Sequence, residues 1–151
     1  MALWRLYYHL VWATKERYPL ILPEREIELH RYIIKKADIL NSITHAIGGT
    51  ANHIHLVASI PPTLSIADFV KNIKGSSSHY FNQNWQNSNK FGWQEGYGIF
   101  SLGQKQLDEA VAYVLNQKIH HSQGSVNHYL ERIINQNEPP VRWHSNDLTN
   151  P

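Results

Sequence analysis

The stretch "SITHAIGGTANHIHLVASI", residues 42 to 60, has the pattern of two short strands joined by a tight turn. Apolar and β-branched residues flank the sequence "GGTAN" at residues 48 to 52. Glycine- and asparagine-containing turns of this kind join neighbouring antiparallel strands. The stretch therefore predicts an antiparallel hairpin, and this hairpin determines how the rest of the chain can be arranged.

The second predicted strand carries two histidines, His53 and His55, in an otherwise apolar run. Because side chains alternate along a strand, both histidines and Val57 share one face, with a rise of about 7 Å between the two histidines. Two imidazoles placed in this way can bind one metal ion if they lean together, or they can form a hydrogen-bonded pair within the hairpin. A histidine-triad hydrolase would need a third histidine where Val57 stands, and a two-histidine phosphoesterase would need His-x-Thr or His-x-Ser motifs.

The segments on either side of the hairpin predict the remaining elements. A first strand is alternating and aromatic, and the two longer helices have apolar residues at helical spacing. The resulting order β-α-β-β-α-β with one further helix is that of the ferredoxin-like, RRM-like split βαβ, an α+β fold with an antiparallel sheet and helices on one face. The predicted elements outside the hairpin are a strand at residues 3–14, helices at 23–41 and 66–85, a strand at 97–103 and a helix at 104–124.

Two details of the predicted helices can be tested by the structure. The first helix should bury isoleucines at helical spacing. The second should begin at Ser65, whose side chain can cap it with Asp68 three residues on, and Gly75 is a candidate interruption. The isoleucines of the first helix are Ile27, Ile33, Ile34 and Ile39.

The composition indicates one globular domain. The chain has 151 residues, of which 42% are hydrophobic and 17% charged, which excludes a disordered chain and a membrane-spanning one. The absence of cysteine excludes disulfides, thiolate metal sites and a cysteine nucleophile. No secretory signal is recognisable at the N-terminus, so we expect a cytoplasmic protein. We expect the domain to span residues 1–124, with a tail at 125–151 that includes a short helix of the same domain.

The formal net charge of +2 does not by itself indicate a nucleic-acid partner. No acidic residue lies between Asp68 and Glu95, whereas three lysines and several aromatic residues do. Basic groups interleaved with aromatic rings suit a single-stranded nucleic acid, whose backbone is charged and whose bases stack. A solvated helix face beside a core cluster would give the same pattern.

The last predicted helix has an unusual tyrosine. On a helical wheel of about 100° per residue, Tyr113 and Gln117 lie outside the apolar arc and are stacked four residues apart. We therefore expect the arc to be the buried face of this helix. Tyr113 is then either an ordinary exposed tyrosine or a nucleophile beside an amide oxygen that binds metal. The arc consists of Leu107, Val111, Val114, Leu115 and Ile119.

Taken in order, these motifs resemble a known family. The sequence "HIH", followed by "GYGIFSL" and then by "AYVLNQKIHH" with a tyrosine four residues before a glutamine, is similar to the HUH single-strand DNA transposases that use one tyrosine. The resemblance is strongest to the transposases of the simplest bacterial insertion sequences and to their REP-associated relatives. It runs from "YYHLVWATKERYPLI" to the second histidine of "HH", and "VKNIKGSSS" also fits it.

The resemblance implies a site and a reaction. His53, His55 and Gln117 would bind Mg²⁺ or Mn²⁺, and Tyr113 would attack single-stranded DNA with hairpin ends to form a 5′-phosphotyrosine. It also implies a bacterial cytoplasmic enzyme, a homodimer with active sites shared between subunits, and no nucleotide cofactor. On charge and position, we predict contacts with the DNA backbone for Arg5, Lys15, Arg17, Lys71 and Lys74.

Two other functions fit parts of the sequence. An RRM-like sheet that has lost its chemistry could bind single-stranded nucleic acid through the aromatic residues of the first strand. A metal-stabilised structural dimer would bind metal without attaching to DNA. The aromatic residues of the first strand are Trp4, Tyr7, Tyr8 and Trp12.

Overall fold

Four strands form one antiparallel sheet in the computed structural model, which describes residues 2–85 and 90–117. The predicted hairpin pairs two of these strands, with a register shift between Thr44 and Ala46. The order across the sheet is β2-β3-β1-β4, so the strand that carries the two histidines is central. The strands are β1 (Tyr7–Ala13), β2 (Ile43–Thr50), β3 (His53–Ser59) and β4 (Gly98–Leu102).

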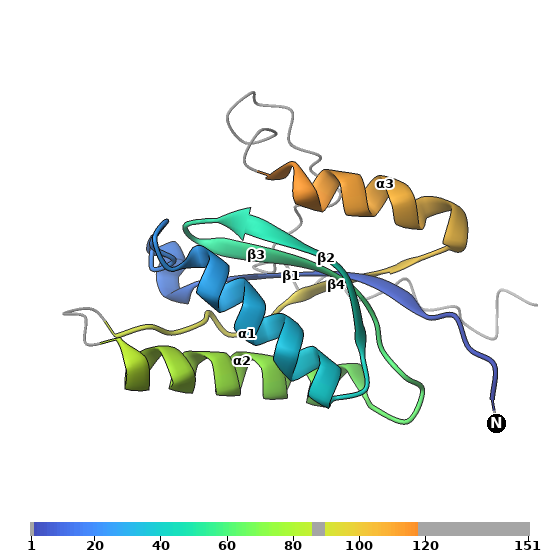
Figure 1. The fold of residues 1–151 in the computed structure, drawn as a ribbon, viewed down its shortest axis with the longest axis horizontal. Coiled ribbons are helices and arrows are strands. Elements are labelled where there is room, and N and C mark those ends of the chain that lie inside the picture. Colours follow the sequence, from blue (N-terminus) through green and yellow to red (C-terminus); the bar gives the residue numbers. More distant parts are fainter. Residues whose placement is uncertain (1, 86–89, 118–151) are drawn as a thin grey trace, which may run out of the picture.

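Helices cover both faces of this sheet (Figure 1). Helices α1 (Glu26–Ile39) and α2 (Ile66–Asn84) pack together on one face, as the ferredoxin-like arrangement predicts. Helix α3 (Gln104–Leu115) lies on the opposite face, over β2 and β3. The α+β prediction is confirmed, but the expectation that the helices share one face holds only for α1 and α2. Because helices cover both faces of the sheet, every residue of β3 is buried.

The main hydrophobic core lies between the sheet and α1 and α2. On β3 the side chains that face this core are those that alternate with the two histidines, as the sequence predicted. A smaller cluster lies under α3 and includes Val57 and Val114. The main core includes Leu10 and Trp12 from β1, Ile54, Leu56 and Ala58 from β3, Leu29, Ile33 and Ala37 from α1, and Phe69, Ile73 and Phe81 from α2.

The helix predictions hold in part. The Ser65 side chain accepts a hydrogen bond from the Asp68 backbone N–H, which confirms the N-cap, and α2 continues through Gly75 without a break. In α1, Ile33 is buried as predicted together with Leu29 and Ala37. The helix turns Leu29, Ile33 and Ala37 toward the sheet. The other three isoleucines of the predicted face are therefore exposed: Ile27, Ile34 and Ile39.

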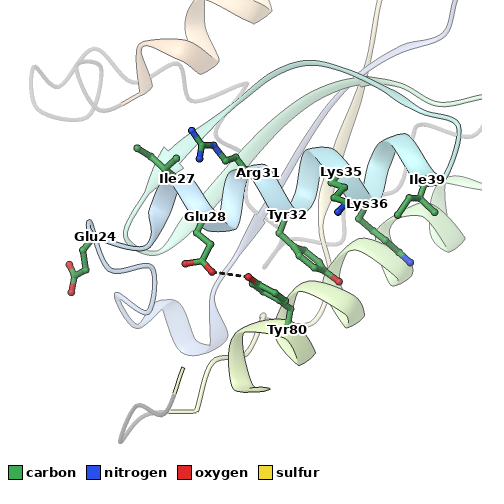
Figure 2. A pocket seen from close by; sticks show the side chains of 9 residues that line it. All are labelled: Glu24, Ile27, Glu28, Arg31, Tyr32, Lys35, Lys36, Ile39 and Tyr80. Atoms are coloured by element: carbon green, nitrogen blue, oxygen red, sulfur yellow. Dashed lines mark hydrogen bonds between the residues drawn. The ribbon is translucent and has the colours of Figure 1, made fainter. Parts of the chain in front are cut away.

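A surface pocket lies along α1 and faces α2, away from α3 (Figure 2). Tyr32 and Tyr80 stack there with ring centroids 4.5 Å apart, and the Tyr80 hydroxyl donates to the Glu28 carboxylate at 2.7 Å. These contacts join α1 to α2.

In residues 2–85 and 90–117, no helix is long and apolar enough to cross a membrane. The predicted tail at 125–151 lies outside the described residues.

Candidate active site on the α3 face of the sheet

The two histidines of β3 point toward α3 and converge. Their ring centroids are 5.1 Å apart, closer than the strand rise of about 7 Å between them. His53 is 3% exposed and His55 is fully buried. The imidazoles therefore lean together inside the protein, as binding of one ion would require.

Hydrogen bonds at Nδ1 hold both rings. His53 Nδ1 lies 2.8 Å from Asn52 Oδ1 and 2.9 Å from Thr50 Oγ1. Because an amide oxygen only accepts, His53 carries its proton on Nδ1 and presents a lone pair at Nε2. His55 Nδ1 lies 2.7 Å from Nε2 of His9. The other ring nitrogen of each histidine, Nε2, is shielded from solvent.

Helix α3 brings the predicted tyrosine onto these histidines. The Tyr113 ring lies edge-on to His55, with ring centroids 6.1 Å apart. Gln117, two residues beyond the end of α3, is 1% exposed, and its Oε1 is buried. His53, His55 and Tyr113 therefore lie together on the α3 face of the sheet, and α3 packs on the sheet of its own chain.

The predicted buried face of α3 holds in part: Val114 is buried, and Leu107 and Val111 pack against the same cluster. Tyr113 is only 8% exposed and lies on the buried side, whereas Leu115 of the expected apolar face is 64% exposed. The reason is the surface that α3 covers: the histidine rings and small residues of the hairpin accept a tyrosine and an amide where an aliphatic core would not. The predicted extension of this helix also differs, because α3 ends at Leu115 with Asn116 as its C-cap. Residues 118–124 lie outside the described residues.

Gly48 allows α3 to approach the sheet this closely. It pairs with His55 across the hairpin, and a Cβ at Gly48 would lie 2.2 Å from the backbone oxygen of Val114. Any side chain would collide with the helix backbone. From the sequence, Gly48 was expected only in the turn, although a glycine within a strand pattern often marks the close approach of another backbone.

His9 is the second residue that the sequence analysis missed. It lies on β1, opposite Val57 of β3 and Phe100 of β4, and is fully buried. Residues directly opposite each other in a sheet share a face. His9 therefore belongs to the face of His53 and His55, an assignment that required the strand register as well as the alternation within "YYHLVWA".

The donor set fits a divalent ion that prefers oxygen and imidazole. Within residues 2–85 and 90–117, no group of three or more His, Cys, Asp or Glu side chains could hold a metal. The buried amide oxygen of Gln117 is the third ligand that the resemblance implies. Two imidazole nitrogens and one amide oxygen, without thiolate, are compatible with Mg²⁺ or Mn²⁺.

The five predicted DNA contacts are scattered over the molecule. Arg5 lies near the start of α3, where its Nη1 donates to Gln104 Oε1 at 3.1 Å. Lys15 and Arg17 belong to the short 3-10 helix η1 (Lys15–Arg17) that follows β1. Lys71 and Lys74 are on α2, across the sheet from the histidines. Only Arg5 is therefore placed beside the helix that carries Tyr113.

Lys74 has a structural role that the sequence did not indicate. Its ammonium group donates to the backbone oxygens of Gln94 and Gly96 at 2.6 and 2.8 Å. Burial lowers the pKa of Lys74, and the nearby Glu95 carboxylate partly opposes this shift. Lys74 thus links α2 to the segment that leads into β4.

We expect Lys74→Met to lower the free energy of unfolding by about 2–3 kcal/mol, because hydrogen bonds from a charged group contribute about 1.5–3 kcal/mol each and Lys74 is only partly buried. Urea denaturation measures the change. The matched control is Lys71→Met on the exposed side of α2, which should change stability by less than about 0.5 kcal/mol. Equal stability of the two variants would contradict the structural role of Lys74.

Comparison with known proteins identifies the family. The chain matches the family described as "Transposase IS200 like" over residues 2–117. The chain belongs to this family. The resemblance found in the sequence is thereby confirmed, and the chain has the function of a transposase, a DNA-processing enzyme.

Relatives of this IS200-like transposase include curated proteins of two genera. The transposase for insertion sequence element IS200 of Salmonella typhimurium is 27% identical over 105 residues, covering 66% of this chain and 69% of that protein. The ISDra2 transposase TnpA of Deinococcus radiodurans is 34% identical over 77 residues, covering 50% of this chain and 54% of that protein.

Solved structures share the fold. A crystal structure of a Deinococcus radiodurans protein assigned as a transposase has a TM-score of 0.58 and 25% identity, covering 77% of this chain and 93% of that one. A REP-associated tyrosine transposase bound to a REP hairpin has a TM-score of 0.61 and 16% identity, covering 80% of this chain and 74% of that one. The second likeness concerns the fold alone.

Proposed function

We propose that this IS200-like transposase cleaves and rejoins single-stranded DNA through Tyr113, with a divalent metal ion bound by His53, His55 and Gln117. One observation supports the proposal: the buried Tyr113 of α3 lies edge-on to His55, whose ring converges with that of His53, and the buried Gln117 follows two residues beyond the end of this helix. A hydrophobic core that contributed only to stability would not need the buried polar side chains of His53, His55 and Gln117.

The metal ligands would be Nε2 of each histidine and Oε1 of Gln117. A bound Mg²⁺ or Mn²⁺ would withdraw negative charge from the scissile phosphate. The chain itself contributes pre-organisation. The Asn52 and Thr50 oxygens fix the His53 ring, and the packing of α3 on β3 fixes the distance between ligands from different elements. Such a site binds its ion without reorganising the fold.

Tyr113 would act as the nucleophile. Its phenolic oxygen forms a bond to phosphorus, the bond from phosphorus to the 3′-oxygen breaks, and the leaving strand ends in a 3′-hydroxyl. The proton lost by the phenol balances the proton gained by the 3′-oxygen. Because the phosphodiester bond is exchanged for a phosphotyrosine bond, the reverse attack by a 3′-hydroxyl rejoins DNA without a nucleotide cofactor. The buried ring of Tyr113 has few rotamers to lose, which favours a reactive geometry.

The DNA substrate of this proposal is a single strand with hairpin ends. It is supported by the shared fold with a relative bound to a REP hairpin. Arg5 is the best placed of the five candidate backbone contacts, because it lies beside the start of α3. A homodimer with active sites shared between subunits completes the proposal.

Covalent trapping tests this function directly. The protein is incubated with a library of labelled single-stranded hairpin DNAs and Mg²⁺ or Mn²⁺, and adducts that survive denaturation are counted. Removing the ion with a chelator should lower adduct formation by at least about 1000-fold, since metal stabilisation of a developing charge is worth several kcal/mol. His53→Ala should have a comparable effect. DNA binding without any adduct would favour the chemically inactive, RRM-like binding protein instead.

A further inference from the structure

His9 is a fully buried histidine for which the proposed reaction has no role. Its Nε2 lies 2.7 Å from Nδ1 of His55, and the two ring centroids are 5.0 Å apart with an interplanar angle of 32°. The contact joins β1 to β3 on the face that α3 covers. His9 thus touches a proposed metal ligand on the side away from the metal-binding nitrogen.

A hydrogen bond between two neutral imidazoles has two arrangements. Either His9 donates from Nε2 and His55 accepts at Nδ1, or His55 donates from Nδ1 and His9 accepts. In the first arrangement His55 carries its proton on Nε2 and cannot bind a metal there. In the second arrangement the Nε2 lone pair of His55 is available. The partner of His55 therefore decides whether this ring is a ligand.

We propose that His9 is a positioning residue that accepts the Nδ1 proton of His55 and so holds His55 as a metal ligand through Nε2. This inference depends on the proposed function, which makes His55 a ligand. Its counterpart is the contact of His53 with the Asn52 oxygen, so both histidines are held in the same tautomer by an acceptor at Nδ1. Outer acceptors of this kind fix the orientation and tautomer of metal-binding histidines.

The identity of the acceptor has a chemical consequence. Carboxylates often hold metal-binding histidines in this way and add negative charge to the site. His9 as a neutral imidazole and Asn52 as an amide add none. The full positive charge of the ion then acts on the phosphate, which suits a reaction in which the nucleophile approaches a phosphodiester.

Three variants separate positioning from packing. His9→Leu removes the acceptor and retains an apolar side chain in the buried space. His9→Gln retains an acceptor, the amide oxygen, near the position of the imidazole nitrogen. Val57→Ala is the matched packing control, because Val57 lies opposite His9 on the same face and packs in the hydrophobic cluster under α3. Thermal unfolding of the three variants measures how much stability each substitution costs.

Two readouts are independent of DNA cleavage. Histidine-selective ¹⁵N NMR of the full chain should show the His55 proton on Nδ1 in the wild type and a shift toward Nε2 in His9→Leu. Titration with Mn²⁺, followed by electron paramagnetic resonance of the unbound ion, should show about a 10-fold or greater loss of affinity in His9→Leu. His9→Gln and Val57→Ala should stay within about threefold of the wild type, well below that loss.

The outcomes separate this inference from the proposed function. A wild-type protein that forms the DNA adduct but carries the His55 proton on Nε2 overturns the role of His9 alone. The same holds if Val57→Ala and His9→Leu weaken Mn²⁺ binding equally, because packing then explains the loss. A wild-type protein that binds no Mn²⁺ and forms no adduct overturns the proposed function, and the role of His9 with it.

Discussion

Tyr113→Phe should abolish the covalent attachment of this transposase to DNA while leaving its fold intact. The substitution removes only the phenolic oxygen, so the ring retains its edge-on contact with His55 and its place in the cluster between α3 and the sheet. Removing a catalytic nucleophile typically lowers the rate by about 10⁴-fold or more. Stability should change by no more than about 1.5 kcal/mol, the usual contribution of one hydrogen bond. Denaturing gels with labelled hairpin DNA measure the adduct, and thermal unfolding measures the stability.

The matched control is Tyr80→Phe. Tyr80 also loses a hydroxyl, one that donates to Glu28 across α1 and α2, but it lies on the opposite face of the sheet (Figures 1 and 2). We expect a comparable loss of stability and an undiminished DNA adduct. An adduct that persists in Tyr113→Phe would show that another residue is the nucleophile. Loss of the adduct in both variants would mean that tyrosine hydroxyls act on the fold and not on the phosphate.

The hairpin and its histidines could be predicted because they depend on local rules. Alternation along β3 separates His53 and His55 from Ile54 and Leu56, and the glycine-containing turn sets the pairing of β2 with β3. The N-cap at Ser65 is equally local. These features need only a few neighbouring residues, so one sequence is sufficient to place them.

The burial of Tyr113 on α3 could not be predicted in the same way. A helical wheel ranks faces by hydrophobicity and assumes an apolar partner, whereas α3 packs on a surface that contains His53 and His55. The hydrogen bond between His9 and His55 joins two residues that are 46 positions apart in sequence. It depends on the register of β1 against β3, which alternation within each strand does not give. The sequence patterns that predicted the fold therefore did not predict polar contacts between elements that are distant in sequence.

Gly48→Ala should separate α3 from the sheet and thereby inactivate the site without touching any of its side chains. The new Cβ would lie 2.2 Å from the Val114 backbone oxygen, and a backbone atom cannot move aside as a flexible side chain can. The helix must shift, and Tyr113 and Gln117 move with it. Because a displacement of about 1 Å can cost about 100-fold in rate, we expect adduct formation to fall by at least that factor. Overpacking should also cost about 1–3 kcal/mol of stability.

Gly75→Ala is the control that isolates the steric cause. It also replaces glycine by alanine, but in the interior of α2, where nothing lies within 4 Å of the added Cβ. We expect it to raise stability by about 0.5–1 kcal/mol and to leave the adduct unchanged. Hydrogen exchange locates the effect: in Gly48→Ala, amides of α3 should lose protection while those of β1 and β3 retain it. If α3 stays protected and the adduct forms normally, close packing of α3 on Gly48 cannot be what assembles the site.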